Sequence, residues 1–238
     1  MTPFLSVRLL AILGLTLLSG CGSPPGQPRK GTETLAPNDL VSFDALYADN
    51  CAGCHGASGR GGVAISLGDP VYLAVVSDTA MRAVIANGVQ GTSMPAFAQS
   101  AGGTLTDRQI DVITRDIRSR WSRPGILDAA HPPSYAATST GDVARGQAAF
   151  ATYCQACHGQ NGRGGAKGSA IANDSFLALV SDQGLRTIVI AGRPELGAPD
   201  WRGNAERAMS DQDVTDVVAW LSSRRAHAPG QPYAEDSD

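Results

Sequence analysis

The feature that most constrains this chain is an internal repeat. The block Cys51–Gly62 returns as Cys154–Gly165, with the same Cys-x-x-Cys-His-Gly opening and the same Gly-Arg-Gly-Gly ending, 103 residues later. A second match, Ser77-Asp78 with Ser181-Asp182, is offset by 104 residues. One residue is therefore inserted between the two matches, most simply in the loop before Phe176. A repeat of this length predicts two similar domains in tandem.

Each repeat is expected to contain a helix that leads into the Cys motif and another that closes the domain. The first closing helix is predicted at 107–121, after Thr106, and the second at 211–223, after Ser210. Apolar residues in both stretches recur at steps of three and four, and Thr and Ser are preferred N-caps. The chain leaves no room for a sizeable sheet, so the sequence predicts an all-α fold.

The first residues resemble the leader of an exported bacterial lipoprotein. Arg8 is the only charge before a short apolar run, Leu9–Leu18, which ends in Leu-Ser-Gly-Cys21. In such a lipobox the Cys is lipidated and becomes the first residue of the mature protein. The alternative is an ordinary secretory peptide with an incidental Cys. Four of the five cysteines belong to the two repeats, which leaves Cys21 over and no pair for a disulfide.

The leader and the repeat together divide the chain into six segments. We predict a signal peptide at 1–20, a lipid-anchored flexible tether at 21–38, a first domain at 39–122, a short Pro-containing linker at 123–140, a second domain at 141–227 and a disordered tail at 228–238. The protein is accordingly expected to be exported and held on a membrane, facing the periplasm or the cell exterior.

Cys-x-x-Cys-His is the attachment signal for c-type haem. The two thiols bond the haem vinyl groups, and the adjacent imidazole binds the iron. The alternatives are a zinc site, which needs further ligands, and a thioredoxin-like redox pair, which needs a βαβ context. The sequence predicts two covalently bound haem c groups. The attachment residues are Cys51, Cys54, Cys154 and Cys157, and the iron ligands beside them are His55 and His158.

Together these residues resemble tandem class I cytochromes c, and the resemblance covers about Asp39 to Arg225. It implies a small helical domain around each haem, with His on one side of the iron and usually Met on the other. In the first repeat, Met94 in Gly91–Phe97 matches the family's distal-ligand loop, and Met ligation raises the potential. Arg60 and Arg163 are candidates to bind haem propionates; the alternative is that both are solvated loop arginines.

The second repeat departs from the family at the distal loop. The offset of 104 places Ala198 over Met94, and an alanine side chain cannot bind iron. Met209 is a possible distal ligand, although it aligns with Leu105 and suits the core. Other candidate donors are Lys167, His227 and His131. The remaining alternative is an iron with an open or water-bound distal position.

The helix crossing differs between the repeats as well. The family packs a Gly of its first helix against an aromatic residue of its last, and Gly146 and Trp220 match that pair. The first repeat has Phe43 and Asp116 at these positions. We expect Phe43 to fill the crossing, with small or aliphatic contacts from the last helix.

Charge and motifs favour electron transfer over catalysis. Removal of 1–20 leaves 18 basic and 22 acidic residues, a net charge of −4, and no basic stretch indicates nucleic acid. We expect respiratory redox partners with a basic docking patch.

The leading hypothesis is a dihaem carrier of single electrons between respiratory components at the outer side of a bacterial membrane. One alternative is a ligand-binding or catalytic haem, with Asp200 and Arg202 near an open second iron. The other is a fixed subunit of an oxidase or reductase complex, and whether the protein is an enzyme stays open.

Overall fold

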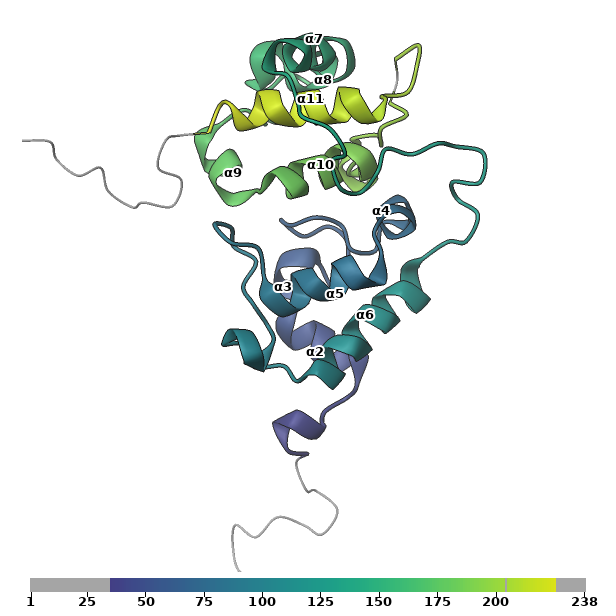
Figure 1. Ribbon diagram of the computed structural model, residues 1–238, viewed down its shortest axis with the longest axis vertical. Helices are drawn as coiled ribbons and strands as arrows, with labels where there is room; N and C mark the ends of the chain where they lie inside the picture. Colours follow the sequence, from purple (N-terminus) through teal and green to yellow (C-terminus); the bar gives the residue numbers. More distant parts are fainter. Residues whose placement is uncertain (1–34, 204, 226–238) are drawn as a thin grey trace, which may run out of the picture. The chain divides into compact units, whose positions relative to one another are not determined.

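The computed structural model describes residues 35–203 and 205–225 (Figure 1). The chain divides into two units, 1–39 and 40–238, and the described part of the first unit holds one short 3-10 helix, η1 (Pro37–Asp39). Both Cys motifs belong to the second unit. The predictions for the leader, Cys21, most of the tether, His227 and the tail lie outside the described residues.

Each repeat is built from four principal helices, a one-turn helix at the Cys motif and short 3-10 turns. In the first repeat these are α2 (Phe43–Asn50), α3 (Ala52–His55), α4 (Pro70–Val75), α5 (Asp78–Asn87), η2 (Gln99–Ala101) and α6 (Asp107–Trp121). In the second they are α7 (Val143–Tyr153), α8 (Gln155–His158), η3 (Gln160–Gly162), α9 (Asp174–Leu179), α10 (Asp182–Ala191), η4 (Pro194–Leu196) and α11 (Asp211–Ser222).

The all-α prediction is confirmed over residues 35–203 and 205–225. Outside the helices, these residues form only isolated bridges, Ala98 with Leu105 and Arg193 with Ala198, and no strand. No helix in this part of the chain combines the length and apolar character needed to cross a membrane.

The closing helices begin where the sequence predicted. Thr106 accepts a hydrogen bond from the N–H of Gln109, whose side chain accepts one from the N–H of Thr106 in return, and Ser210 and Asp213 form the same reciprocal pair. These capping boxes satisfy N–H groups that a helix leaves unpaired at its start. The extra residue of the second repeat lies between α8 and α9, because α8 starts 103 residues after α3, whereas α9, α10 and α11 start 104 residues after α4, α5 and α6.

The crossing of α7 and α11 confirms the predicted Gly146–Trp220 contact. A Cβ added to Gly146 would lie 2.0 Å from the carbonyl oxygen of Asp216 and 2.7 Å from the Trp220 Cβ, so only glycine fits this approach. The Trp220 ring stacks on Phe150, with centroids 4.4 Å apart, and both side chains are buried. Yellow α11 and teal α7 lie side by side in Figure 1.

The matching crossing of α2 and α6 uses a different set of side chains. Phe43 is buried as expected, but the prediction of small or aliphatic partners from the last helix was wrong. The Arg120 guanidinium lies 4.4 Å from the centre of the Phe43 ring, and Trp121 meets that ring edge-on with centroids 5.8 Å apart. Arg224, which aligns with Arg120, covers Trp220 at 4.1 Å in the second repeat. The aromatic residue has changed helices, and the arginine that covers it has stayed in register.

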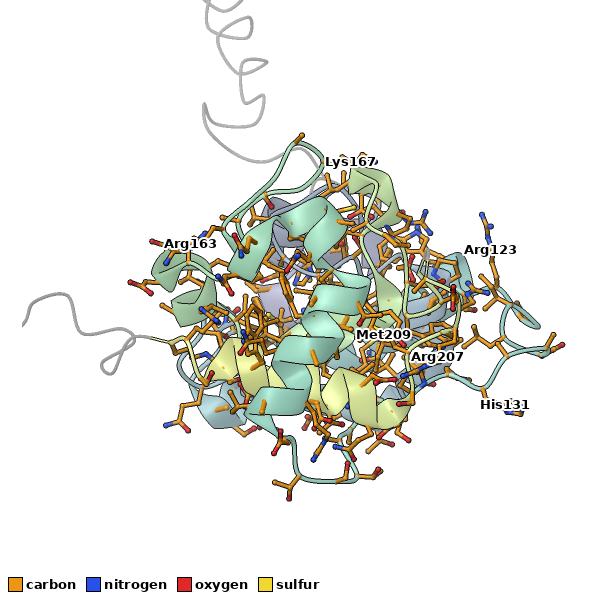
Figure 2. The ribbon with its side chains drawn as sticks, turned by 90° about the horizontal axis from the view of Figure 1, so that it is seen from above. Arg123, His131, Arg163, Lys167, Arg207 and Met209 are labelled. Carbon is orange, nitrogen blue, oxygen red and sulfur yellow. The ribbon has the colours of Figure 1, made fainter. Side chains whose placement is uncertain are left out.

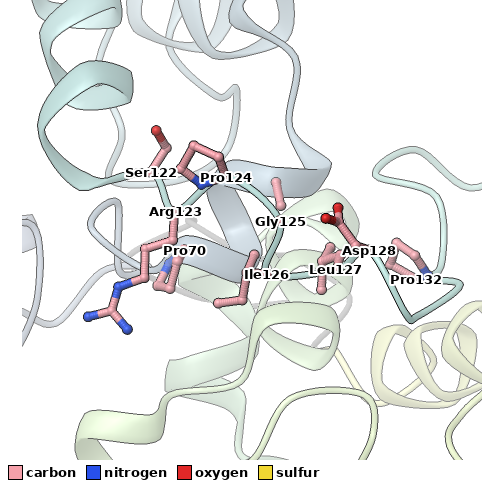
Figure 3. Close-up of a pocket in the computed structure, with 10 residues that line it drawn as sticks. Pro70, Ser122, Arg123, Pro124, Gly125, Ile126, Leu127, Asp128 and Pro132 are labelled. Atoms are coloured by element: carbon pink, nitrogen blue, oxygen red, sulfur yellow. The ribbon is translucent and has the colours of Figure 1, made fainter.

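The linker lies along both repeats rather than hanging free. Its Ser134 accepts a hydrogen bond from the Arg186 Nε at 2.9 Å and donates its N–H to Asp211 at 2.8 Å. Further upstream, residues 122–128 and Pro132 line a pocket of about 340 Å³ against Pro70 and Ala74 (Figure 3). This pocket contains none of the Cys and His residues that the sequence predicts to hold haem.

Candidate functional site

Each Cys motif ends in a histidine whose ring is held by one backbone hydrogen bond. The Nδ1 atom of His55 lies 2.8 Å from the carbonyl oxygen of Ile65, and the Nδ1 atom of His158 lies 2.8 Å from that of Ser169. A carbonyl oxygen only accepts hydrogen bonds, so the proton must sit on Nδ1. The Nε2 lone pair of both rings is then free to bind a metal, which is the arrangement that metal-ligating histidines commonly have.

None of the four described cysteines, which are Cys51, Cys54, Cys154 and Cys157, forms a disulfide. Burial, followed by the neighbouring Cys54, raises the pKa of Cys51 to about 11, and burial followed by Cys157 raises the pKa of Cys154 to about 12. Thiols that exchange disulfides have a lowered pKa instead. No group of three His, Cys, Asp or Glu side chains suited to a metal occurs among the described residues, so nothing there supports the zinc alternative. Two cysteines and an imidazole nitrogen available to a metal fit covalent haem attachment in each motif.

The chain folds back tightly after each histidine. Gly56 and Gly159 have positive φ angles of 81° and 71°, and an added Cβ would lie 1.8 Å from the Arg60 oxygen and 2.0 Å from the Gly164 oxygen. The Tyr47 hydroxyl also donates to the Gly56 carbonyl at 3.0 Å. These turns bring the chain back toward the Cys motif, where Ile65 and Ser169 accept from the two imidazoles.

The two propionate candidates have different surroundings. The guanidinium of Arg60 donates from Nε and Nη2 to the Gly68 carbonyl at 2.9 and 2.5 Å, so part of it closes its own loop. Arg163 is exposed and lies at the edge of the molecule in Figure 2. Propionate binding by both residues stays a prediction.

Met94 lies in a loop that is fixed by its own backbone. Its carbonyl oxygen accepts from the Val89 N–H at 3.0 Å, its N–H donates to the Thr92 hydroxyl at 3.2 Å, and its side chain is half-buried. Nothing in the described residues tests whether its sulfur binds iron, so distal ligation by Met94 stays a prediction.

The corresponding loop of the second repeat has the same backbone hydrogen bond but no sulfur atom at the aligned position. The Arg193 N–H donates to the Ala198 carbonyl at 3.0 Å, the counterpart of the bond between Val89 and Met94. Gly192 also matches Gly88, since both have positive φ and an added Cβ at either would collide with the backbone of the loop. The loop geometry therefore supports the alignment that places Ala198 where Met94 stands.

Met209 occupies a core position. Its N–H donates to the Trp201 carbonyl at 2.9 Å, and that of Leu105 donates to the aligned Phe97 carbonyl at 2.8 Å. The Met209 side chain is 6% exposed and belongs to the hydrophobic core, as does Leu105. Figure 2 shows Met209, Lys167 and His131 well apart from one another, with Lys167 and His131 at the edges of the view.

The sequence reading missed two charged residues in the second distal loop. Arg193 donates from Nη2 to the Gly62 carbonyl of the first repeat at 2.8 Å, and Glu195 accepts from the Ser66 hydroxyl at 2.5 Å. The two side chains also pair with each other, with Nε and Oε1 2.6 Å apart. The sequence did hold a signal for them, because Arg193 and Glu195 stand where the first repeat has the uncharged Val89 and Gly91.

Comparison with known proteins gives matches in both repeats. A family model described as "Cytochrome C oxidase, cbb3-type, subunit III" matches residues 38–115 and 141–221. Subunit CcoP of a cbb3-type cytochrome c oxidase from Azospirillum sp. (strain B510) is 30% identical over 142 residues, which cover 53% of this chain and 43% of the relative. Subunit FixPc of a cbb3-type cytochrome c oxidase from Rhizobium leguminosarum bv. viciae is 26% identical over 191 residues, covering 75% and 58%. The chain spans about half the length of these curated relatives.

Solved structures resemble the chain only weakly. The Kuenenia stuttgartiensis reducing HAO-like protein complex Kustc0457/Kustc0458 matches with a TM-score of 0.45 and 16% identity, over 79% of this chain and 98% of that chain. The dihydro-heme d1 dehydrogenase NirN matches with a TM-score of 0.29 and 28% identity, over 43% and 18%. Scores at this level are too low to define a shared fold.

Proposed function

The chain belongs to the family of cbb3-type cytochrome c oxidase subunit III, and from this premise we propose that it carries single electrons between respiratory components at the outer side of a bacterial membrane. It is a tandem class I c-type cytochrome. The observation that carries the proposal is the pair of Cys-x-x-Cys-His turns, each with two cysteines outside any disulfide and an imidazole whose Nδ1 bond to a carbonyl oxygen leaves Nε2 available to a metal. Haem iron would supply the one-electron chemistry.

The residues of each repeat would hold and orient the group. Cys51 and Cys54 would attach one haem, and Cys154 and Cys157 the other. The carbonyl bonds to Nδ1 of His55 and His158 fix the ring orientation and favour electron donation through Nε2. A Met94 thioether on the first iron would stabilise its ferrous form and raise its potential.

The membrane attachment and the partners of this carrier are proposed from the sequence that follows the predicted signal peptide. Lipidation at Cys21 would anchor the protein to a membrane that faces the periplasm or the cell exterior, and residues 21–38 would act as a tether. The net charge of −4 favours redox partners with a basic docking patch, because complementary charge speeds docking.

A second candidate is a fixed subunit of an oxidase complex. It is favoured by the curated relatives, both of which are named as subunits of a cbb3-type oxidase. Mild-detergent purification of the full chain from its own membranes distinguishes the two roles. A fixed subunit would copurify in constant ratio with other oxidase subunits, whereas a free carrier would purify without them.

The electron-carrier proposal is tested on the purified full-length protein. A pyridine haemochrome assay should give two haems per chain, and the double variant Cys154→Ser/Cys157→Ser should give one. Stopped-flow mixing with a reduced quinol-oxidoreductase fraction, then with an oxidase, should show reduction followed by reoxidation of the wild type. A protein with fewer than two haems, or one that neither fraction reduces or oxidises, would contradict the proposal.

A further inference from the structure

The second repeat carries a distal loop that is complete in its backbone but has no iron ligand at the matching position. The Arg193–Ala198 hydrogen bond reproduces the bond between Val89 and Met94, so Ala198 holds the same place in its loop as Met94 does in the first repeat. Alanine lacks the Cγ, Sδ and Cε atoms of methionine. The exchange therefore removes the donor atom and leaves space for a ligand with few heavy atoms.

The loop is anchored on two sides, which opposes a rearrangement that would bring in another donor. The Arg193 guanidinium bonds the Gly62 carbonyl, and the Glu195 carboxylate accepts from Ser66. Their side chains are only 12% and 18% exposed. On the other flank, the Trp201 carbonyl accepts from the Met209 N–H, and the Met209 side chain is committed to the core.

The charged side chains of the loop are paired within it, which bears on the class of ligand. Arg193 pairs with Glu195, and Arg202 pairs with Asp200 through two Nε contacts of 3.0 Å and through Nη2. Asp200 and Arg202, which the sequence placed near an open iron, therefore neutralise each other. An anionic ligand would meet no uncompensated positive charge from these side chains, whereas a neutral one needs none.

We propose that the second repeat is a binding site for a neutral diatomic molecule such as CO or NO, which ferrous haem iron held by His158 would bind because Ala198 supplies no donor atom at the distal-loop position. The inference rests on the attachment of haem at Cys154 and Cys157 proposed above. Binding forms one dative bond from the ligand to the iron and releases at most a water molecule, with no net oxidation or reduction.

The test is a CO titration of the dithionite-reduced full-length protein, followed by its optical difference spectrum. The wild type should bind one CO per chain, at half of its haem. Ala198→Met should bind none, because the thioether restores the missing donor. Met209→Leu, which installs the residue of the first repeat, and His227→Ala should both behave as the wild type.

Several outcomes would overturn the inference. If the wild type binds no CO, a protein side chain closes the second iron, and whichever of Met209→Leu, His227→Ala and Lys167→Ala gains CO binding identifies it. Met94→Ala covers the case in which Ala198→Met fails to fold. It should raise binding from one CO to two per chain, and a value that stays at one would place the open iron in the first repeat. A haemochrome count below two per chain would instead contradict the proposed function.

Discussion

At the scale of the residue, one arginine appears twice in different surroundings. Arg82 is half-exposed and pairs with Asp107 at 2.8 Å and with Asp111 at 2.6 Å. Its counterpart Arg186 is 3% exposed, pairs with Asp211, and donates to Thr215 at 2.9 Å and to the linker carbonyl of Ser134 at 2.9 Å. The linker thus turns a surface ion pair into a buried one.

We predict that Arg186→Ala lowers the free energy of unfolding of the second repeat by about 3 kcal/mol, because it leaves the hydrogen-bonding partners of a buried arginine without their donor. The matched variant Arg82→Ala should have little effect, since exposed ion pairs contribute little. Urea titrations of the two holoproteins, followed by far-UV circular dichroism, measure both changes. Equal losses in the two variants would contradict the prediction that coverage by the linker makes Arg186 contribute more to stability than Arg82.

At the scale of the element, the approach of α7 to α11 depends on a missing side chain. In Gly146→Ala the new Cβ would lie 2.0 Å from the Asp216 carbonyl oxygen, and backbone cannot move aside as a flexible side chain can. Overpacking of this kind costs about 3 kcal/mol, of which the higher helix propensity of alanine offsets about 1 kcal/mol. We predict a net loss of about 2 kcal/mol in the unfolding free energy of the second repeat.

Gly53→Ala is the control for this substitution. A Cβ at Gly53 would have no atom within 4 Å, and the second repeat has Ala156 at the same place. The control should keep the haem content and the urea midpoint of the wild type. If both variants lose stability alike, glycine flexibility rather than helix contact governs the effect.

The sequence predicted those parts of the fold that are encoded locally or by the repeat. The closing helices, their caps and the Gly146–Trp220 contact follow from spacing and from alignment. Alignment of the repeats did not predict which arginine side chains bind the backbone carbonyls at the ends of neighbouring helices. Arg118 donates to the Val76 carbonyl at 2.8 Å, and Arg225 donates to the aligned Val180 carbonyl at 2.6 Å. The two arginines are 107 residues apart, so no constant offset pairs them.

At the scale of the whole molecule, the same distinction separates what could be predicted of the site. Alignment of the two repeats predicts the candidate Cys and His residues and the exchange of Met94 for Ala198. Contacts from Arg193 to Gly62 and from Glu195 to Ser66 join residues about 130 positions apart, and no periodicity indicates them. They bring a distal loop of one repeat to the segment whose Ile65 carbonyl holds the imidazole of the other.

These contacts predict that charges of the second repeat set the potential of the first haem. Burial lowers the pKa of His55, and Arg193 adds to this lowering, so its charge is felt at the ring. Burial acts to raise the pKa of Glu195, but the hydrogen bonds from Ser66 and Arg193 outweigh it and lower the pKa, which keeps the carboxylate charged at neutral pH. A nearby positive charge favours ferrous over ferric iron, and a negative charge does the reverse.

Arg193→Gln should therefore lower the potential of the first haem and Glu195→Gln should raise it, each on the order of 30 mV, where about 59 mV corresponds to a tenfold change in a one-electron equilibrium. Spectroelectrochemical titration resolves the two haems. Met94→His identifies the first, because imidazole in place of a thioether lowers its potential. Arg123→Gln removes the same charge from an exposed linker position (Figure 2) and should shift neither haem, since solvent and salt screen it. Shifts of the same sign in the Arg193 and Glu195 variants would refute electrostatic control, because the two side chains carry opposite charges.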